Sequence, residues 1–138
     1  MFAMRMLWAQ FAEVDAKHLA LGRAAWKAIT SGSPEQLQRL VEQGTAAIPT
    51  MAIAFRRHLQ ELPSRRNGLS LSEQLTLRVL RDKGPMNAAR LFGWYTNHYE
   101  PLPFLGDTGY WLVIKGLADP RPLISRSRVT SRVNGKWN

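Results

Sequence analysis

The chain has 138 residues, of which 45% are hydrophobic and 21% charged, so it is long and apolar enough to form one domain with a buried core. This composition excludes a disordered chain, and the absence of any stretch of about 18 apolar residues argues against a transmembrane helix. The 19 Lys and Arg residues exceed the 10 Asp and Glu residues, which gives a net charge of +9 and favours partners that carry negative charge.

The first part of the chain has the periodicity of a helix. Apolar residues recur every three to four positions from Met4 to Ile29, apart from Asp15 and the small Gly22. Because this span is longer than most helices, we expect a break near one of those two residues.

Two further helices are predicted before the middle of the chain. Residues 33–36 (Ser-Pro-Glu-Gln) form a helix-start signal, with a capping box between the serine and the glutamine, and predict a helix over 34–43. An apolar stripe at helical spacing predicts a helix over 48–62, which Pro63 ends.

The second half begins with a linker and continues with three short helices. Residues 64–69 (Ser-Arg-Arg-Asn-Gly-Leu) have the composition of a linker. Helical spacing then predicts helices over 70–82, 88–99 and 107–118. Each has a capping residue at its start, namely Ser70, Asn87 and Asp107.

The end of the chain differs from the rest. β-Branched residues and an Asn-Gly pair between residues 123 and 135 predict a short β-hairpin. Three helices followed by a hairpin is the order of a winged helix-turn-helix. The predicted fold class is therefore mainly α: an N-terminal helical bundle over 1–63, a linker over 64–69, and a winged-helix-like module over 70–138.

Basic residues concentrate around the linker and in the tail. Arg outnumbers Lys fourteen to five, which favours bidentate contacts to phosphate or carboxylate. The tail after Asp119 carries no acidic residue. As phosphate contacts we predict six arginines: Arg65, Arg66, Arg121, Arg126, Arg128 and Arg132.

The helix over 107–118 is a poor candidate for reading bases. We assign its large apolar residues to the core: Tyr110, Trp111, Ile114 and Leu117. The positions that remain offer no Arg, Asn or Gln for bidentate contacts to bases. Sequence-specific readout by this helix is therefore not expected.

A stripe on the preceding helix has two interpretations. Arg90, Trp94 and His98 lie off its apolar face and could stack on exposed bases. Alternatively, Trp94 packs against the N-terminal helices and marks an interface, with Arg90 covering its rim. We prefer the second interpretation.

No constellation of catalytic or metal-binding residues is recognisable. His18 lies one helical turn from Asp15, but no nucleophile accompanies them. His58 lacks the second histidine of a zinc motif, and the chain contains no cysteine. The glycines at 106–109 lack the remaining residues of a nucleotide-binding fingerprint. We therefore predict a protein that is not an enzyme and has no metal and no cofactor.

Three motifs follow one another in the second half. They are residues 57–64 (Arg-His-Leu-Gln-Glu-Leu-Pro-Ser) with Gly-Leu-Ser at 68–70, residues 103–107 (Pro-Phe-Leu-Gly-Asp), and residues 122–124 (Pro-Leu-Ile). Over roughly residues 50–125 the chain resembles an uncharacterised bacterial family, a domain of unknown function. Relatives carry an additional N-terminal Rossmann-like domain, so the resemblance implies a C-terminal portion or a shortened relative. It implies a bacterial origin and assigns no catalytic residue.

Two functions follow from these patterns. The first is a regulatory module that contacts the nucleic-acid backbone without sequence specificity; because no secretory signal is present, we expect it in the cytoplasm and not at a membrane. The alternative is a protein-interaction or oligomerisation domain, since five tryptophans are many for one small core. A contiguous basic face with buried aromatics favours nucleic acid, whereas an exposed aromatic patch favours a protein partner or a second copy.

Overall fold

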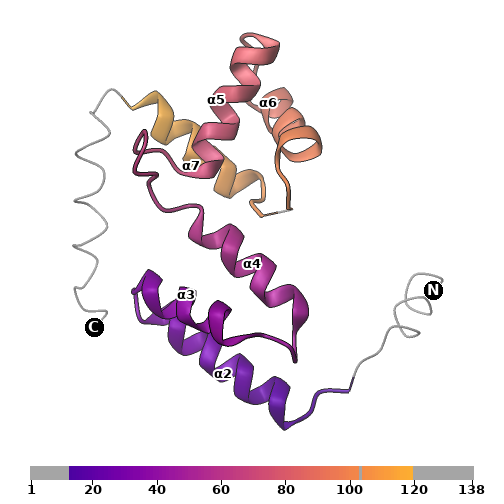
Figure 1. The fold of residues 1–138 in the computed structure, drawn as a ribbon. Helices are drawn as coiled ribbons and strands as arrows, with labels where there is room; N and C mark the ends of the chain where they lie inside the picture. Colours follow the sequence, from indigo (N-terminus) through magenta and orange to yellow (C-terminus); the bar gives the residue numbers. More distant parts are fainter. Residues whose placement is uncertain (1–12, 103, 120–138) are drawn as a thin grey trace, which may run out of the picture. The chain divides into compact units, whose positions relative to one another are not determined.

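The computed structural model describes residues 13–102 and 104–119, and the chain divides into two compact units, Met1–Phe55 and Arg56–Asn138 (Figure 1). The division lies within one helix, α4 (Pro49–Leu59). The predicted linker, 64–69, belongs to the second unit, where the Ser64 N–H donates to the Leu69 carbonyl at 3.0 Å.

The first unit is built on two helices that lie side by side, α2 (Ala16–Thr30) and α3 (Pro34–Gln43). Small residues on α2 let α3 approach closely, and the buried residues of the pair are Ala25, Ala28, Leu37, Leu40 and Val41. The packing between the two helices therefore uses the alanine face of α2.

Local capping decides where α2 begins. The Asp15 carboxylate accepts hydrogen bonds from the N–H groups of Lys17 at 2.8 Å and His18 at 3.0 Å. The His18 ring accepts in return from the Asp15 N–H, which completes a capping box. Of the two predicted break points, Asp15 is therefore where the helix starts, and Gly22 lies inside it.

The start of α3 differs from the prediction. Ser33 makes no side-chain cap, and its hydroxyl donates instead to the Glu35 carboxylate at 2.5 Å. The capping box predicted between Ser33 and Gln36 is therefore wrong, because a nearer acceptor takes the serine hydroxyl.

The second unit packs three helical segments around a small core. They are α5 (Leu71–Lys83), α6 (Ala88–Trp94), which continues directly into the π-helical segment η1 (Tyr95–Tyr99), and α7 (Asp107–Ala118). The buried cluster between them consists of Leu75, Val79, Leu91, Tyr95 and Tyr110. The rings of Tyr95 and Tyr110 lie with their centroids 4.4 Å apart, so α7 is fixed against η1 by aromatic packing.

The winged-helix prediction is wrong, although the mainly helical fold is confirmed. Residues 13–102 and 104–119 contain helices and no β-strand. The physical reason is that side chains of α5, α6, η1 and α7 form the core of the second unit among themselves, so that this core contains no strand. The segment 123–135, in which the β-hairpin was predicted, lies outside the described residues.

The cap of α5 leads to a stability prediction. The Ser70 hydroxyl accepts from the Glu73 N–H at 3.2 Å, and the Glu73 carboxylate accepts from the Ser70 N–H at 2.9 Å. Replacing Ser70 with Ala is expected to cost about 1 kcal/mol of unfolding free energy, measured by urea denaturation followed by circular dichroism. Ser33→Ala is the matched control, because Ser33 makes no cap; equal losses in both variants would contradict the assignment.

Candidate functional site

A buried polar cluster joins the end of α4 to α5 and η1. The guanidinium of Arg57 donates to Glu100 at 2.7 and 2.8 Å, to Glu61 at 2.6 Å and to the Ser72 hydroxyl at 2.9 Å. The Tyr95 hydroxyl donates to the same Glu100 carboxylate and lies 3.0 Å from the Ser72 hydroxyl. The arrangement is a closed network of charge-assisted hydrogen bonds.

The network keeps its two central groups charged although they are buried. Burial disfavours the carboxylate form of Glu100, but the hydrogen bonds from Arg57 and Tyr95 outweigh it and lower the pKa of Glu100. Burial likewise opposes the charge on Arg57, yet its hydrogen bonds to Glu100 and Glu61 raise its pKa. Burial and the bond to Glu100 raise the pKa of Tyr95 to about 12, so its hydroxyl stays protonated.

This cluster has the character of a structural element. The side chains of Arg57 and Glu100 are 3% and 1% exposed, and the ring of Phe104 lies 4.4 Å from the guanidinium carbon of Arg57. A substrate has no access to groups enclosed to this degree. We therefore assign the cluster to holding the second unit together and look for a ligand site at the surface.

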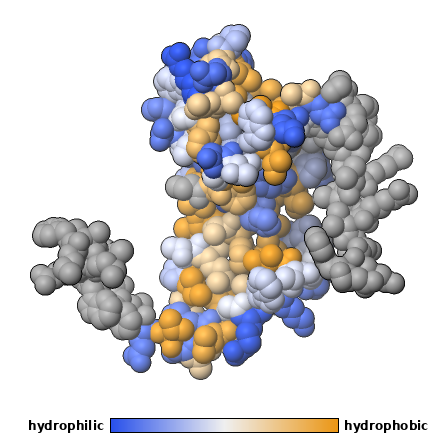
Figure 2. All heavy atoms as spheres, turned by 180° about the vertical axis from the view of Figure 1, so that it is seen from behind, coloured by the Kyte–Doolittle hydropathy of each residue, from blue (hydrophilic) through white to orange (hydrophobic). Residues whose placement is uncertain are grey.

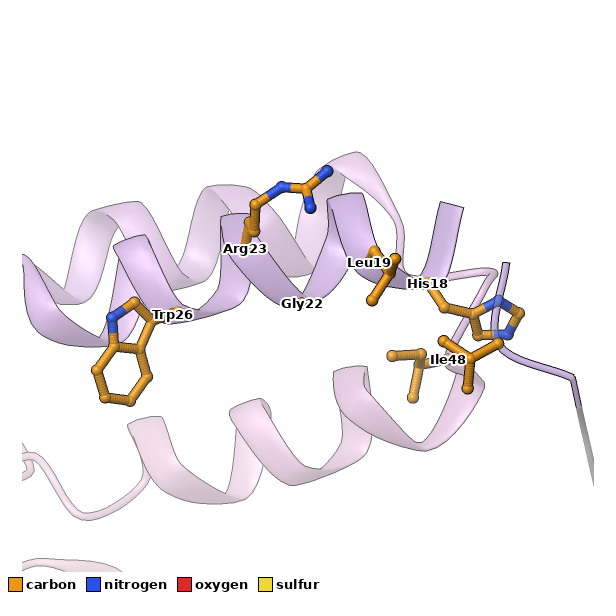
Figure 3. A pocket seen from close by; sticks show the side chains of 7 residues that line it. His18, Leu19, Gly22, Arg23, Trp26 and Ile48 are labelled. Atoms are coloured by element: carbon orange, nitrogen blue, oxygen red, sulfur yellow. The ribbon is translucent and has the colours of Figure 1, made fainter. Parts of the chain in front are cut away.

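The first unit carries an open apolar groove of about 530 Å³ beside α2 (Figure 3). Trp26 stands at one end of it with 70% of its surface exposed, while His18 and Ile48 lie at the other end. The residues that line this groove, called the α2 groove below, are Val14, His18, Leu19, Gly22, Arg23, Trp26 and Ile48. Hydrophobic groups also reach the surface among hydrophilic ones in the space-filling view (Figure 2).

Gly22 gives the groove its depth. It lies inside α2, where glycine costs about 0.5–1 kcal/mol relative to alanine. A Cβ built on Gly22 would meet no atom within 4 Å, so no neighbouring atom requires a glycine at this position. The missing side chain leaves space between Trp26 and the far end of the groove, which is consistent with a surface shaped to accept apolar groups.

The helix beside the groove is basic after its N-cap Asp15. Helix α2 carries Lys17, Arg23 and Lys27, and no Asp or Glu occurs between Ala16 and Thr30. Arg23 lines the groove itself. An apolar groove lined by Arg23 suits a ligand that is apolar on one side and acidic on the other. The Asp15 carboxylate, 2.7 Å from the His18 ring, is paired within the protein.

Comparisons with known protein families, curated proteins and solved structures found no match to this chain.

Two of the six predicted phosphate contacts are among the described residues. Arg65 and Arg66 are exposed in the loop between α4 and α5. The other four predicted contacts lie outside the described residues: Arg121, Arg126, Arg128 and Arg132.

Of the predicted stripe Arg90, Trp94 and His98, the structure brings Trp94 and His98 into contact. The rings of Trp94 and His98 lie with centroids 4.6 Å apart, and the Lys83 ammonium is 4.5 Å from the Trp94 ring centroid. Trp94 packs against the core of the second unit, whereas Arg90 is exposed. The cation over Trp94 is therefore Lys83 and not Arg90.

Sequence reasoning missed the α2 groove because helical periodicity alone does not show that Trp26 is exposed. It also placed Trp111 in the core, although Trp111 is 51% exposed. The available signal was Gly22, four residues before Trp26 and on the same helix face. On one helix face, the missing side chain of Gly22 leaves space next to the large side chain of Trp26.

The described residues form neither a metal site nor a membrane-spanning helix. Within residues 13–102 and 104–119, no three side chains of the ligand types His, Cys, Asp and Glu gather closely enough to hold a metal ion. None of the helices in this same part of the chain combines the length and apolar character needed to cross a membrane.

Proposed function

We propose that the protein is a protein-interaction module whose α2 groove binds an acidic amphipathic helix of a partner. The observation that carries the proposal is the 70% exposure of Trp26 at the mouth of an apolar groove. Tryptophan is enriched among the residues that dominate binding energy at protein interfaces. Among the two functions expected from the sequence, an exposed aromatic patch favours the protein partner.

The shape of the groove supports a helix as occupant. It runs beside α2 from Trp26 to Ile48, and its volume of about 530 Å³ falls in the range of ligand sites. Amphipathic helices bind such grooves with apolar side chains spaced three to four residues apart. Two further large apolar residues of the first unit are exposed, Ile29 and Ile53.

The charge of α2 supports an acidic occupant. Arg23 lines the groove, and within α2 itself Lys17, Arg23 and Lys27 are accompanied by no Asp or Glu; the nearest acidic residue is the N-cap Asp15, which is paired with His18. Acidic residues on the polar faces of the bound helix would meet these basic residues and accelerate association.

A peptide titration tests the proposal. The probe is a fluorescently labelled 18-residue peptide with Leu at helical spacing on one face and Glu on the others, followed by anisotropy. Because truncation of an interface hot spot costs 2 kcal/mol or more, Trp26→Ala is expected to weaken binding by about 30-fold. Gly22→Leu should block the groove equally well without destabilising α2, because leucine is a better helix former than glycine.

Two controls make the outcome decisive. Trp111→Ala removes an exposed tryptophan from the second unit and should leave the affinity unchanged. A peptide with the same leucines and with Lys in place of Glu should bind at least tenfold more weakly. The proposal is overturned if Trp26→Ala binds like the wild type. It is also overturned if sedimentation shows a dimer that Trp26→Ala abolishes, because the occupant is then a second copy.

A further inference from the structure

A second groove, of about 410 Å³, lies along α5 in the second unit. Two arginines and two side-chain amides line it, whereas one arginine and no side-chain amide line the α2 groove. Its lining residues are Asn67, Leu69, Leu71, Gln74, Leu75, Leu77, Arg78 and Arg81, and none of them is acidic.

The loop beside this groove is held in place by hydrogen bonds. The Gly68 N–H donates to the Ser64 carbonyl at 2.8 Å, and Gly68 has a φ of +71°, which glycine adopts without strain. The Gln74 side chain donates to the Leu69 carbonyl at 3.0 Å, and the Asn67 side chain accepts from the Leu69 N–H at 3.1 Å. The loop is therefore fastened to α5.

This fastening fixes the backbone of two more basic residues next to the groove in the sequence. Arg65 and Arg66 are exposed and directly precede Asn67, which lines the groove. A backbone held in this way reduces the entropy lost when a ligand orders the loop.

Most of the positive charge in this region is not neutralised. Arg81 is paired with Asp82 at 2.8 Å, so one carboxylate offsets one guanidinium. Within the described residues, the four close ion pairs include none of Arg65, Arg66 and Arg78; Arg78 lies near enough to Asp82 for its charge to lower the pKa of that carboxyl, but makes no direct pair with it. Three guanidinium groups thus remain available to an anionic ligand.

We propose that the α5 groove and its loop bind the phosphate backbone of a nucleic acid. Guanidinium groups donate in the planar, bidentate geometry that phosphate oxygens accept. The leucines of the groove, of which Leu77 is 43% exposed, offer apolar contact to sugars or bases without selecting a sequence. This site lies in the other unit from the α2 groove and shares no residue with it, so each can fail without the other.

The test compares two triple variants that lose the same charge. The first is Arg65→Gln with Arg66→Gln and Arg78→Gln. The control is Arg39→Gln with Arg56→Gln and Lys115→Gln, which are exposed and line neither groove. Binding to a labelled 20-base-pair duplex of random sequence is measured by anisotropy at about 50 and 200 mM salt, and circular dichroism verifies folding.

The expected effects follow from counterion release. Each phosphate contact contributes about tenfold at 50 mM salt, so the first triple variant should bind 100- to 1,000-fold more weakly. Its salt dependence should also fall by about 0.9 per arginine in log–log slope. The control should stay within about threefold of the wild type. Equal weakening in both triple variants, or no binding by the wild type at about 50 mM salt, overturns the proposal.

Discussion

Replacing Glu100 with Gln is expected to destabilise the second unit by about 3–5 kcal/mol, because it leaves the buried Arg57 guanidinium without its main counter-charge. The remaining partner, Glu61, is 24% exposed and held by a single bond to the guanidinium. Total stabilities of small proteins are about 5–15 kcal/mol, so the loss is a large part of the whole. Urea denaturation followed by circular dichroism measures it.

Two variants show whether the loss comes from the buried pair. Glu42→Gln alters an exposed carboxylate that accepts one bond from Gln38, and it should change stability by less than about 0.5 kcal/mol. The double variant Arg57→Met with Glu100→Leu removes both charges, so it should be less destabilised than Glu100→Gln alone. A double variant as unstable as the sum of its single changes would contradict this account.

The pH dependence of stability gives an independent measure of Glu100. Its pKa is lower in the folded protein than its ordinary value of 4.5, so its contribution is present above that pH. The contribution is lost as the pH falls through the folded-state pKa. The wild type should therefore lose its advantage over Glu100→Gln in acid, whereas a constant difference at all pH values would assign the effect to packing.

The sequence predicts the helices well where the signal is local. The capping residues Ser70 and Asn87 act as expected, and Asp15 begins α2 because its carboxylate reaches two N–H groups in the next turn. The predicted cap at Asp107 is wrong, because Gly106 holds the N-cap position of α7 and Asp107 is the first residue of the helix. Such signals depend only on residues within one turn of each other. They need no knowledge of the tertiary fold.

The burial of Arg57 and its pairing with Glu100 could not be predicted from local sequence signals. In the sequence it stands beside Arg56 and resembles any charged helix face, yet Arg57 is 3% exposed while Arg56 is exposed. Only Glu61, four residues later, gave a local hint. Glu100 is 43 residues away, and its approach depends on the π-helical turn of η1, which no local pattern predicted.

The residues of the 57–64 and 68–70 phrases have structural roles. Residues 57–64 supply Arg57 and Glu61 to the buried cluster, and Ser70 at the end of the Gly-Leu-Ser phrase caps α5. A motif made of residues that hold a fold together is informative about architecture. It does not by itself indicate a reaction or a ligand.

The exposure of Trp26 could not be predicted because helical periodicity has no information on which of two apolar faces is buried. On α2, the stripe that includes Leu19 and Trp26 has the larger side chains, but Ala25 and Ala28 are the residues that are buried. Small side chains allow close contact between helices, so α3 packs there. The larger apolar stripe is left at the surface as the α2 groove.

A pair of identical substitutions should separate buried from exposed leucine in the second unit. Leu91→Ala removes a side chain that is 5% exposed and belongs to the core cluster, so it should cost about 2–5 kcal/mol of unfolding free energy. Leu112→Ala removes the same atoms from a residue that is 66% exposed on α7, and it should cost less than about 0.5 kcal/mol.

Urea denaturation of both variants measures the contrast, since each change has the same chemistry and both residues lie in helices. A loss above 2 kcal/mol for Leu112→Ala would mean that another surface covers this side of α7 in solution. Leu112 and its neighbour Trp111 would then belong to an interface. A small loss there, together with a large one for Leu91→Ala, confines the core of this unit to the cluster that contains Tyr95 and Tyr110.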